Sequence, residues 1–354
     1  MTGNGQSTLS AHMLRAIRVC VASGLMLMAG CTVTTTPTIV PVIPDRKPPA
    51  QVLSSAPMRF DLPDRTGLVA RVWARPEPRH IVLGVHGFND HSKAFEPLAQ
   101  HLSAELGATL YAYDQRGFGA NPQPGVWAGS DVLLADLRHI AAQVRERHPG
   151  LPLTVVGESM GGALVLVAAS ESPGLQADNI ILQAPAVWGA QSMPWYQRIS
   201  LQLMNIVAPE MTFTGRGVQS FGITPTDDPE TLRDIGRDPL FIKATRVGSL
   251  AGVTDLMGRA QNLSLSPPQR SLVLYGLSDR IIPRRPVCDW LRRLTGNDPP
   301  MSTLGFVIYP DGWHLLTRQL QSREVLQDIR LWLDQVPLPN QVDPQQAKAV
   351  VCVR

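Results

Sequence analysis

Short apolar runs alternate with amphipathic segments through the middle of this chain. Residues 81–85 and 153–156 are hydrophobic at nearly every position, as expected of strands that are covered on both faces of a sheet. Between them, residues 130–147 carry apolar side chains near helical spacing. This alternation predicts an α/β fold with a mostly parallel central sheet and helices on both faces. The expected strands are 58–60, 68–73, 81–85, 109–113, 153–156, 179–183, 271–275 and 304–309, and the expected helices are 94–106, 130–147, a buried one ending at 170, 286–294 and 324–333.

The alternation stops after residue 187 and resumes near residue 267. Residues 188–266 contain no clear β run and hold apolar segments at 199–207 and 241–257. We expect this insertion to be a mainly helical cap on a core made of residues 58–187 and 267–336. The last stretch, 337–354, is polar and contains proline, which predicts a C-terminal tail.

The first 31 residues have the pattern of a targeting segment. Arg15 and Arg18 precede an apolar run, Val19 to Met28, which is too short to span a bilayer as a stable helix. The run ends in Leu27-Met28-Ala29-Gly30-Cys31, which resembles a bacterial lipobox. The resemblance implies acylation of Cys31 as the mature N-terminus and, with non-acidic Thr32 after it, an outer-membrane lipoprotein facing the periplasm. The alternative is an ordinary signal peptide, or an uncleaved anchor, in which Cys31 is incidental.

Residues 32–57 are rich in threonine and proline, which favours extended chain over helix. We expect a tether between the lipid and the folded domain, or alternatively a partly ordered arm on that domain.

Composition excludes several classes of function. The net charge is +3, and the 354 residues contain no dense block of lysine and arginine, so nothing indicates nucleic-acid binding. The four cysteines are spread along the chain without a Cys-x-x-Cys pair, which argues against a zinc site. Cys288 and Cys352 could pair in an oxidising compartment, but the sequence does not show their distance.

The chemistry is concentrated first in Gly157-Glu158-Ser159-Met160-Gly161. This is a Gly-x-Ser-x-Gly sequence between an apolar strand and an apolar helix, the setting of a nucleophile elbow. The glycines leave room for a sharp, strained turn that exposes the Ser159 hydroxyl. The alternative is that Ser159 only caps a buried helix.

A serine nucleophile needs an acid and a base. Asp279 and His314 each follow a predicted strand, and both come after Ser159 in the chain. Asp279 could instead form an Asx turn before Arg280, and His314 could be an ordinary polar loop residue. Asp114 also follows a strand, but we prefer Asp279 because it lies later and follows the penultimate strand. The backbone N–H groups of Met160 and Phe88 are the expected oxyanion-hole donors.

Taken together, the motifs resemble the α/β-hydrolase superfamily, and within it the monoacylglycerol lipase and lysophospholipase-like group of serine aminopeptidase S33-type hydrolases. The resemblance covers about residues 58–336, with one departure at Leu315, where the family often has an acidic residue. The matching pieces are His86-Gly87, Asp114-Gln115-Arg116-Gly117-Phe118-Gly119, Gly157 to Gly162, Arg237-Asp238-Pro239-Leu240, Gly276 to Pro283 and Gly312-Trp313-His314.

The resemblance implies a serine carboxylic-ester hydrolase that works through an acyl-enzyme and acts on monoacyl lipids such as monoacylglycerols or lysophospholipids. No metal or organic cofactor is implied. Amide or peptide hydrolysis, acyl transfer, or a non-catalytic envelope lipoprotein are the alternatives, and oligomeric state stays open. The cap would supply an apolar channel for the acyl chain. The alternative is that its apolar residues only form the hydrophobic core of the cap itself. The candidate lining residues are Trp188, Met193, Trp195 and Met204.

Overall fold

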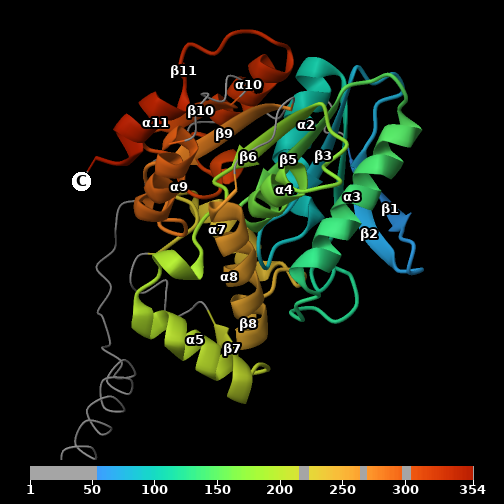
Figure 1. Cartoon of the computed structure of the whole chain (residues 1–354). Coiled ribbons are helices and arrows are strands. Elements are labelled where there is room, and N and C mark those ends of the chain that lie inside the picture. Colours follow the sequence, from blue (N-terminus) through green and yellow to red (C-terminus); the bar gives the residue numbers. More distant parts are fainter. Residues whose placement is uncertain (1–53, 215–222, 264–268, 297–303, 354) are drawn as a thin grey trace, which may run out of the picture. The chain divides into compact units, whose positions relative to one another are not determined.

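A large sheet forms the centre of the described chain (Figure 1). The computed structural model describes residues 54–214, 223–263, 269–296 and 304–353. Within them, nine strands form one sheet in the order β1-β2-β4-β3-β5-β6-β9-β10-β11. The strands from β4 to β10 in that order are parallel, while β1, β2 and β11 are antiparallel to their neighbours. Their bounds are β1 Ala56–Asp61, β2 Gly67–Trp73, β3 His80–Val85, β4 Ala108–Tyr113, β5 Leu153–Glu158, β6 Asn179–Gln183, β9 Arg270–Gly276, β10 Leu304–Tyr309 and β11 Gln341–Val342.

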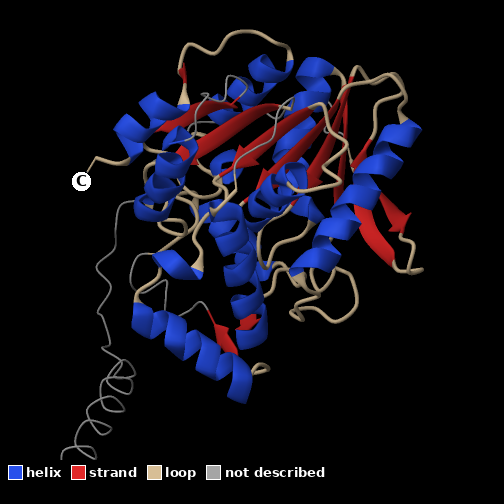
Figure 2. Cartoon of the chain, in the orientation of Figure 1, coloured by secondary structure: helices blue, strands red, loops and turns tan. Residues whose placement is uncertain are grey.

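Helices cover both faces of this sheet (Figure 2). Alternate residues of a strand point to opposite faces, so Leu83 joins one buried cluster and Val82 the other. The first cluster includes side chains of α3, α4, α8, α9 and α11, and the second those of α2 and α10. The predicted two-sided coverage is confirmed. The helices are α2 Glu96–Leu106, α3 Ser130–Arg147, α4 Met160–Ser170, α8 Val247–Gln261, α9 Arg284–Gly296, α10 Ser322–Leu333 and α11 Pro344–Val351.

Helix α4 is buried along nearly its whole length, from Met160 to Ala169. It packs against β5 and β6 on one side and against α3 and α8 on the other. A helix enclosed in this way needs apolar side chains all round, which explains why its sequence shows no polar face.

The insertion after β6 is mainly helical, as expected. It contains η3 Ala190–Ser192, α5 Trp195–Val207, α7 Pro229–Arg237 and α8. It also contains a two-stranded antiparallel sheet of β7 Thr212–Thr214 and β8 Ala244–Arg246, which the sequence pattern did not predict. Each strand has three residues, too few for a period-two pattern to emerge. Figure 1 shows α5, β7 and β8 near α8 and away from the large sheet.

The C-terminal segment is part of the fold, and the expectation of a tail from residue 337 is wrong there. Strand β11 pairs Val342 with Phe306 of β10, and Ala347 on α11 is buried. A disulfide joins Cys288 of α9 to Cys352, with the Cα atoms 5.1 Å apart. The packing of this segment was not evident from its sequence, because α11 buries only Ala347 and Val351.

At the other end of the described chain, β1 begins at Ala56, so the predicted tether ends two residues too late. The signal segment and Cys31 lie outside the described residues. No described helix is long and apolar enough to cross a membrane.

Candidate active site

The parallel strands β3, β5, β9 and β10 deliver four loops to one edge of the sheet. The carboxyl ends of parallel strands lie along the same edge, so residues that follow them in sequence gather there. Ser159 follows β5, Asp279 follows β9, and His314 follows β10. All three are buried, with residue exposures of 8%, 5% and 4%.

Ser159 occupies a strained turn between β5 and α4. Its φ is 55° and its ψ is −116°, a combination that residues with a side chain rarely adopt. The turn is held by main-chain bonds: Ser159 N donates to Gln183 O at 2.9 Å, and Ser159 O accepts from Ala163 N and Ala186 N, each at 3.0 Å. Ser159 is at the N-cap position of α4, yet its side chain makes no capping hydrogen bond. The alternative that Ser159 serves as a helix cap is therefore wrong.

The glycines around Ser159 are required by close backbone packing. A Cβ added to Gly157 would lie 2.5 Å from Gly161 O, and one added to Gly161 would lie 2.0 Å from Val85 O. Both distances are far inside van der Waals contact. The helix can start directly against β3 only because these positions lack side chains.

Asp279 and His314 form a buried pair. His314 Nδ1 lies 2.7 Å from Asp279 Oδ2. The other oxygen, Oδ1, accepts from Ile281 N at 2.8 Å and from Ile282 N at 2.9 Å. The Asx turn considered from the sequence is therefore present, but it uses only one oxygen and leaves the second for the histidine.

The two loops that carry this pair are packed on each other. Leu277 N donates to Tyr309 O and Ser278 N donates to Gly312 O, each at 2.9 Å. A Cβ on Gly276 would lie 2.2 Å from Gly312 O, so glycine is needed for this approach. Asp279 and His314 consequently face each other from loops with little freedom to separate.

His314 is poised to accept a proton. Burial lowers the pKa of the His314 imidazole, but the charge of Asp279, its hydrogen bond and the charge of Glu158 together outweigh burial and Arg318, and the net pKa lies above its usual value. An imidazolium formed during a reaction is thus stabilised where it forms. This is the electrostatic setting of a general base.

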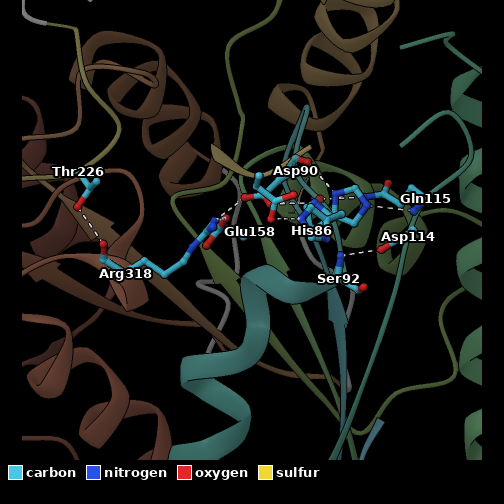
Figure 3. Close-up of polar contacts among 11 residues, drawn as sticks. His86, Asp90, Ser92, Asp114, Gln115, Glu158, Thr226 and Arg318 are labelled. Carbon is cyan, nitrogen blue, oxygen red and sulfur yellow. Dashed lines mark hydrogen bonds and ion pairs between the residues drawn. The ribbon is translucent and has the colours of Figure 1, made fainter. Parts of the chain in front are cut away.

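Asp114, the other candidate for the acid of the triad, binds backbone N–H groups with both carboxylate oxygens. Its Oδ1 accepts from Ser92 N at 2.8 Å (Figure 3). Its Oδ2 accepts from Ala120 N at 2.9 Å. Both oxygens therefore order loops after β3 and β4, which supports the preference for Asp279.

His86 is likewise structural. Its Nε2 accepts from Gln115 N at 3.0 Å, so Nδ1 carries the proton and donates to Gly87 O at 2.8 Å. Burial lowers the pKa of His86 more than nearby Asp114 raises it, which keeps the ring neutral. His91, another histidine that precedes Ser159, bonds Asp238 of the insertion at 3.0 Å.

The loop after β3 lies against the nucleophile. A Cβ on Gly87 would be 3.3 Å from Ser159 Cβ, so the backbone leading to Phe88 passes beside the serine. Met160 is the first residue of α4, directly after Ser159. The assignment of the Phe88 and Met160 N–H groups to an oxyanion hole stays a prediction, and this placement agrees with it.

The four candidate lining residues of the insertion are not equivalent. Trp188 and Met193 are half-buried and pack against the main core, and Met204 on α5 is half-buried. Trp195, also on α5, is 69% exposed. The packing of Trp188 and Met193 supports the alternative in which these side chains belong to a hydrophobic core and do not line a channel. Trp195 faces solvent.

The sequence did not predict a buried ion cluster next to the serine, made of Asp90, Glu158 and Arg318. Arg318 Nη2 donates to Asp90 Oδ2 at 2.7 Å and to Glu158 Oε1 at 2.6 Å (Figure 3). A signal was available in the sequence, because Glu158 is a carboxylate at the end of a mostly apolar strand. Buried carboxylates need a partner, so a search for the cation would have been justified.

Comparisons with known proteins bear on the family and the fold of this chain. The family model described as "Serine aminopeptidase, S33" matches residues 76–321. The chain is 24% identical to human monoglyceride lipase over 305 residues, which is 83% of this chain and 96% of the relative. It is 26% identical to the monoacylglycerol lipase of Mycolicibacterium smegmatis over 281 residues, 75% of this chain and 92% of the relative.

A solved structure has the same fold. The soluble variant of Saccharomyces cerevisiae monoglyceride lipase, crystallised with a substrate analog, superposes with a TM-score of 0.66 at 20% identity, and the match covers 82% of this chain and 99% of that one. The fold class predicted from the sequence is therefore confirmed. With its family model matched over most of its length, this chain belongs to the serine aminopeptidase S33 family of α/β-hydrolases.

Proposed function

We propose that this chain hydrolyses carboxylic esters of monoacyl lipids through a covalent acyl intermediate on Ser159. Membership of the family makes the chain a hydrolase, and its monoglyceride lipase relatives support ester hydrolysis. The observation that carries the mechanism is the 2.7 Å bond between His314 and Asp279, at the same sheet edge as the strained Ser159.

The steps follow from these roles. Asp279 accepts the Nδ1–H of His314, which leaves Nε2 free to take the Ser159 proton as Oγ attacks the ester carbonyl. The N–H groups of Met160 and Phe88 stabilise the oxyanion. Collapse breaks the ester C–O bond, and His314 returns the proton to the leaving alcohol. Water, deprotonated by the same histidine, then attacks the acyl-Ser159 carbonyl. The acyl C–Oγ bond breaks, His314 returns the proton to Oγ, and the carboxylic acid is released.

An exposed apolar face on α5 supports a lipid substrate. Ile199 and Leu203 are more than half exposed, and Ile206 is 77% exposed. These positions recur at spacings of three and four, so they lie along one side of the helix. A helix that presents such a stripe to water is suited to contact with a lipid surface. We propose that the substrate is presented to this face by a membrane or a lipid aggregate.

The proposed location is the bacterial cell envelope, with Cys31 acylated and the enzyme tethered to the outer membrane on the periplasmic side. The Cys288–Cys352 disulfide supports an oxidising compartment, because such bonds are rare in the cytosol. Incorporation of labelled palmitate into the wild type, but not into Cys31→Ser, would test the anchor. Equal labelling of both proteins would disprove it.

Family membership also keeps amide hydrolysis open as a second candidate, because the family model is described as an aminopeptidase. A panel of monoacylglycerols, lysophospholipids, p-nitrophenyl esters and aminoacyl amides separates the two. We expect turnover of the esters and little of the amides. The opposite ranking would replace the proposed function with a peptidase.

The nucleophile is tested with a fluorophosphonate probe and the Ser159→Ala variant. We expect the wild type to be labelled and to hydrolyse esters, and the variant to do neither while its thermal unfolding is nearly unchanged. Full ester hydrolysis by Ser159→Ala would refute the mechanism. Absence of labelling in the wild type would point to a non-catalytic lipoprotein.

A further inference from the structure

Arg318 forms ion pairs with two buried carboxylates, Asp90 and Glu158 (Figure 3). It ends the short helix η4 Leu316–Arg318, which follows His314. Its guanidinium contacts Asp90 and Glu158 at 2.7 and 2.6 Å, and the side chains of Arg318, Asp90 and Glu158 are only 11%, 7% and 3% exposed. A buried arrangement of this kind costs desolvation energy and is weak evidence for added stability, so its placement needs another explanation.

Each member of the cluster adjoins a different proposed catalytic group. Glu158 directly precedes Ser159 in the elbow. Asp90 is two residues after Phe88 in the loop that passes beside the serine, and Arg318 is four residues after His314. One guanidinium group therefore links the segments that carry the nucleophile, the base and the expected oxyanion donor.

Further bonds brace the Arg318 segment from the side of the insertion. The backbone oxygen of Arg318 accepts from Thr226 Oγ1 at 2.9 Å. Leu315 N, next to His314, donates to Pro225 O at 2.9 Å. Arg318 is thereby held at its main chain by the insertion and at its side chain by the other two loops.

The charges explain why the link matters. Burial raises the pKa of Glu158, Asp90 adds to the rise, and Arg318 opposes it. Without the cation, two carboxylates would share a buried site and repel each other or take up protons. Either response shifts the loops on which Ser159 and Phe88 lie.

We propose that Arg318 is a positioning residue: its bonds to Glu158 and Asp90 set the separation of Ser159, His314 and the Phe88 N–H group. This role rests on the proposed function, since it acts through the groups assigned there. Misplacing reacting groups by about 1 Å can lower a rate roughly 10²-fold, which sets the expected size of the effect.

The test compares Arg318→Met and Arg318→Lys with the wild type, using p-nitrophenyl butyrate well below the midpoint of thermal unfolding. For Arg318→Met we expect kcat to fall about 10²-fold with KM nearly unchanged, and fluorophosphonate labelling to slow in the same proportion. Arg318→Lys restores the charge but not the planar fork, so part of the lost kcat should return. Wild-type kcat in Arg318→Met would overturn the role.

Arg116 provides a matched control. It also joins two carboxylates, Asp64 at 2.7 Å and Asp136 at 2.6 Å, and its side chain is 19% exposed. These partners lie on the β1–β2 turn and on α3. Arg116→Met should lower the unfolding midpoint and leave kcat near that of the wild type. An equal loss of kcat in both arginine variants would mean that Arg318 acts only through stability.

Arg318→Met could fail to fold because it leaves two buried carboxylates unpaired. The triple variant Arg318→Met/Glu158→Gln/Asp90→Asn removes those charges and should fold, yet keep the low kcat because the link is absent. Recovery of wild-type kcat in the triple variant would overturn the role. Ser159→Ala is measured in parallel: if it retains activity, the proposed function itself fails, whereas an inactive Ser159→Ala with fully active Arg318 variants rejects only the positioning role.

Discussion

The carboxylate of Asp279 divides its oxygens between two tasks: Oδ2 lies 2.7 Å from His314 Nδ1, while Oδ1 accepts the backbone N–H groups of Ile281 and Ile282. The backbone bonds orient the carboxylate, and the carboxylate orients the imidazole. The histidine tautomer therefore depends on a loop conformation as well as on a side-chain contact.

Asp279→Asn should abolish most activity without unfolding the protein. The backbone N–H groups of Ile281 and Ile282 keep the amide oxygen, so the amide NH2 faces His314 Nδ1 and donates to it. The wrong histidine tautomer is then favoured, and kcat should fall by about 10⁴, as for the same substitution in a serine-protease triad. Steady-state hydrolysis of a p-nitrophenyl ester measures the loss, with thermal unfolding as the control for folding. Retention of a tenth of the activity would exclude Asp279 as the orienting acid.

Activity should decline in acid around a pH that lies above the ordinary pKa of histidine. The base must be neutral, and the pKa of His314 is raised above 6.5 by Asp279 and Glu158 in spite of burial. Activity is therefore present above the raised pKa and lost as the pH falls through it. Glu158→Gln removes one negative charge near the ring, so the acid limb of kcat/KM should move to lower pH. A limb that moves upward would contradict this electrostatic arrangement.

Gly161→Ala should be strongly destabilising, because the new Cβ would lie 2.0 Å from Val85 O. We expect a loss of several kcal/mol, at the upper end of single substitutions. Gly236→Ala on α7 is the matched control, since no atom lies within 4 Å of the position that its Cβ would occupy and its φ is not positive. There the free energy of unfolding should rise by up to about 1 kcal/mol. Chemical denaturation compares the two variants, and similar effects at both positions would refute the packing argument.

Loss of the Cys288–Cys352 disulfide should lower stability. The bond closes a loop with a sequence separation of 64 residues, for which chain entropy predicts about 4 kcal/mol. Thermal unfolding of the wild type with and without reductant, and of Cys352→Ser, measures the effect. Reductant should not change Cys352→Ser further; if it does, another thiol is responsible.

Polar substitution of the exposed α5 face should impair turnover of lipid aggregates selectively. Leu203→Gln/Ile206→Gln should raise the apparent KM for emulsified monoacylglycerol and leave hydrolysis of a soluble short-chain ester unchanged. Val132→Gln on α3 is the control, because Val132 is also exposed, at 40%, but lies on another helix. Equal effects of the two variants on emulsified substrate would exclude α5 as the lipid-facing surface.

Local sequence was sufficient for the regular elements of the core. Helix α3 and strands β6 and β10 have the predicted bounds, because α3 has a clear helical period and the two strands are short apolar runs. Ser159, Asp279 and His314 could be named for a similar reason, since each lies within five positions of the end of a parallel strand. Their common edge follows from topology alone.

Contacts between residues far apart in the chain could not be predicted from the sequence. Arg318 gave no local sign of its contact with Glu158, because the two are 160 residues apart and only the folded sheet brings them together. The three-residue strands β7 and β8 were missed since they carry too few positions for a pattern. The packed C-terminal segment was missed because its order depends on β10 and on a cross-link to α9.

The antiparallel strand β11 also has a consequence for solubility. It pairs with only two residues of β10, yet it occupies the position where another chain could add to the sheet. Helix α11, cross-linked through Cys352, keeps that short strand in place. The disulfide therefore helps to hold a covering strand over an otherwise open sheet edge.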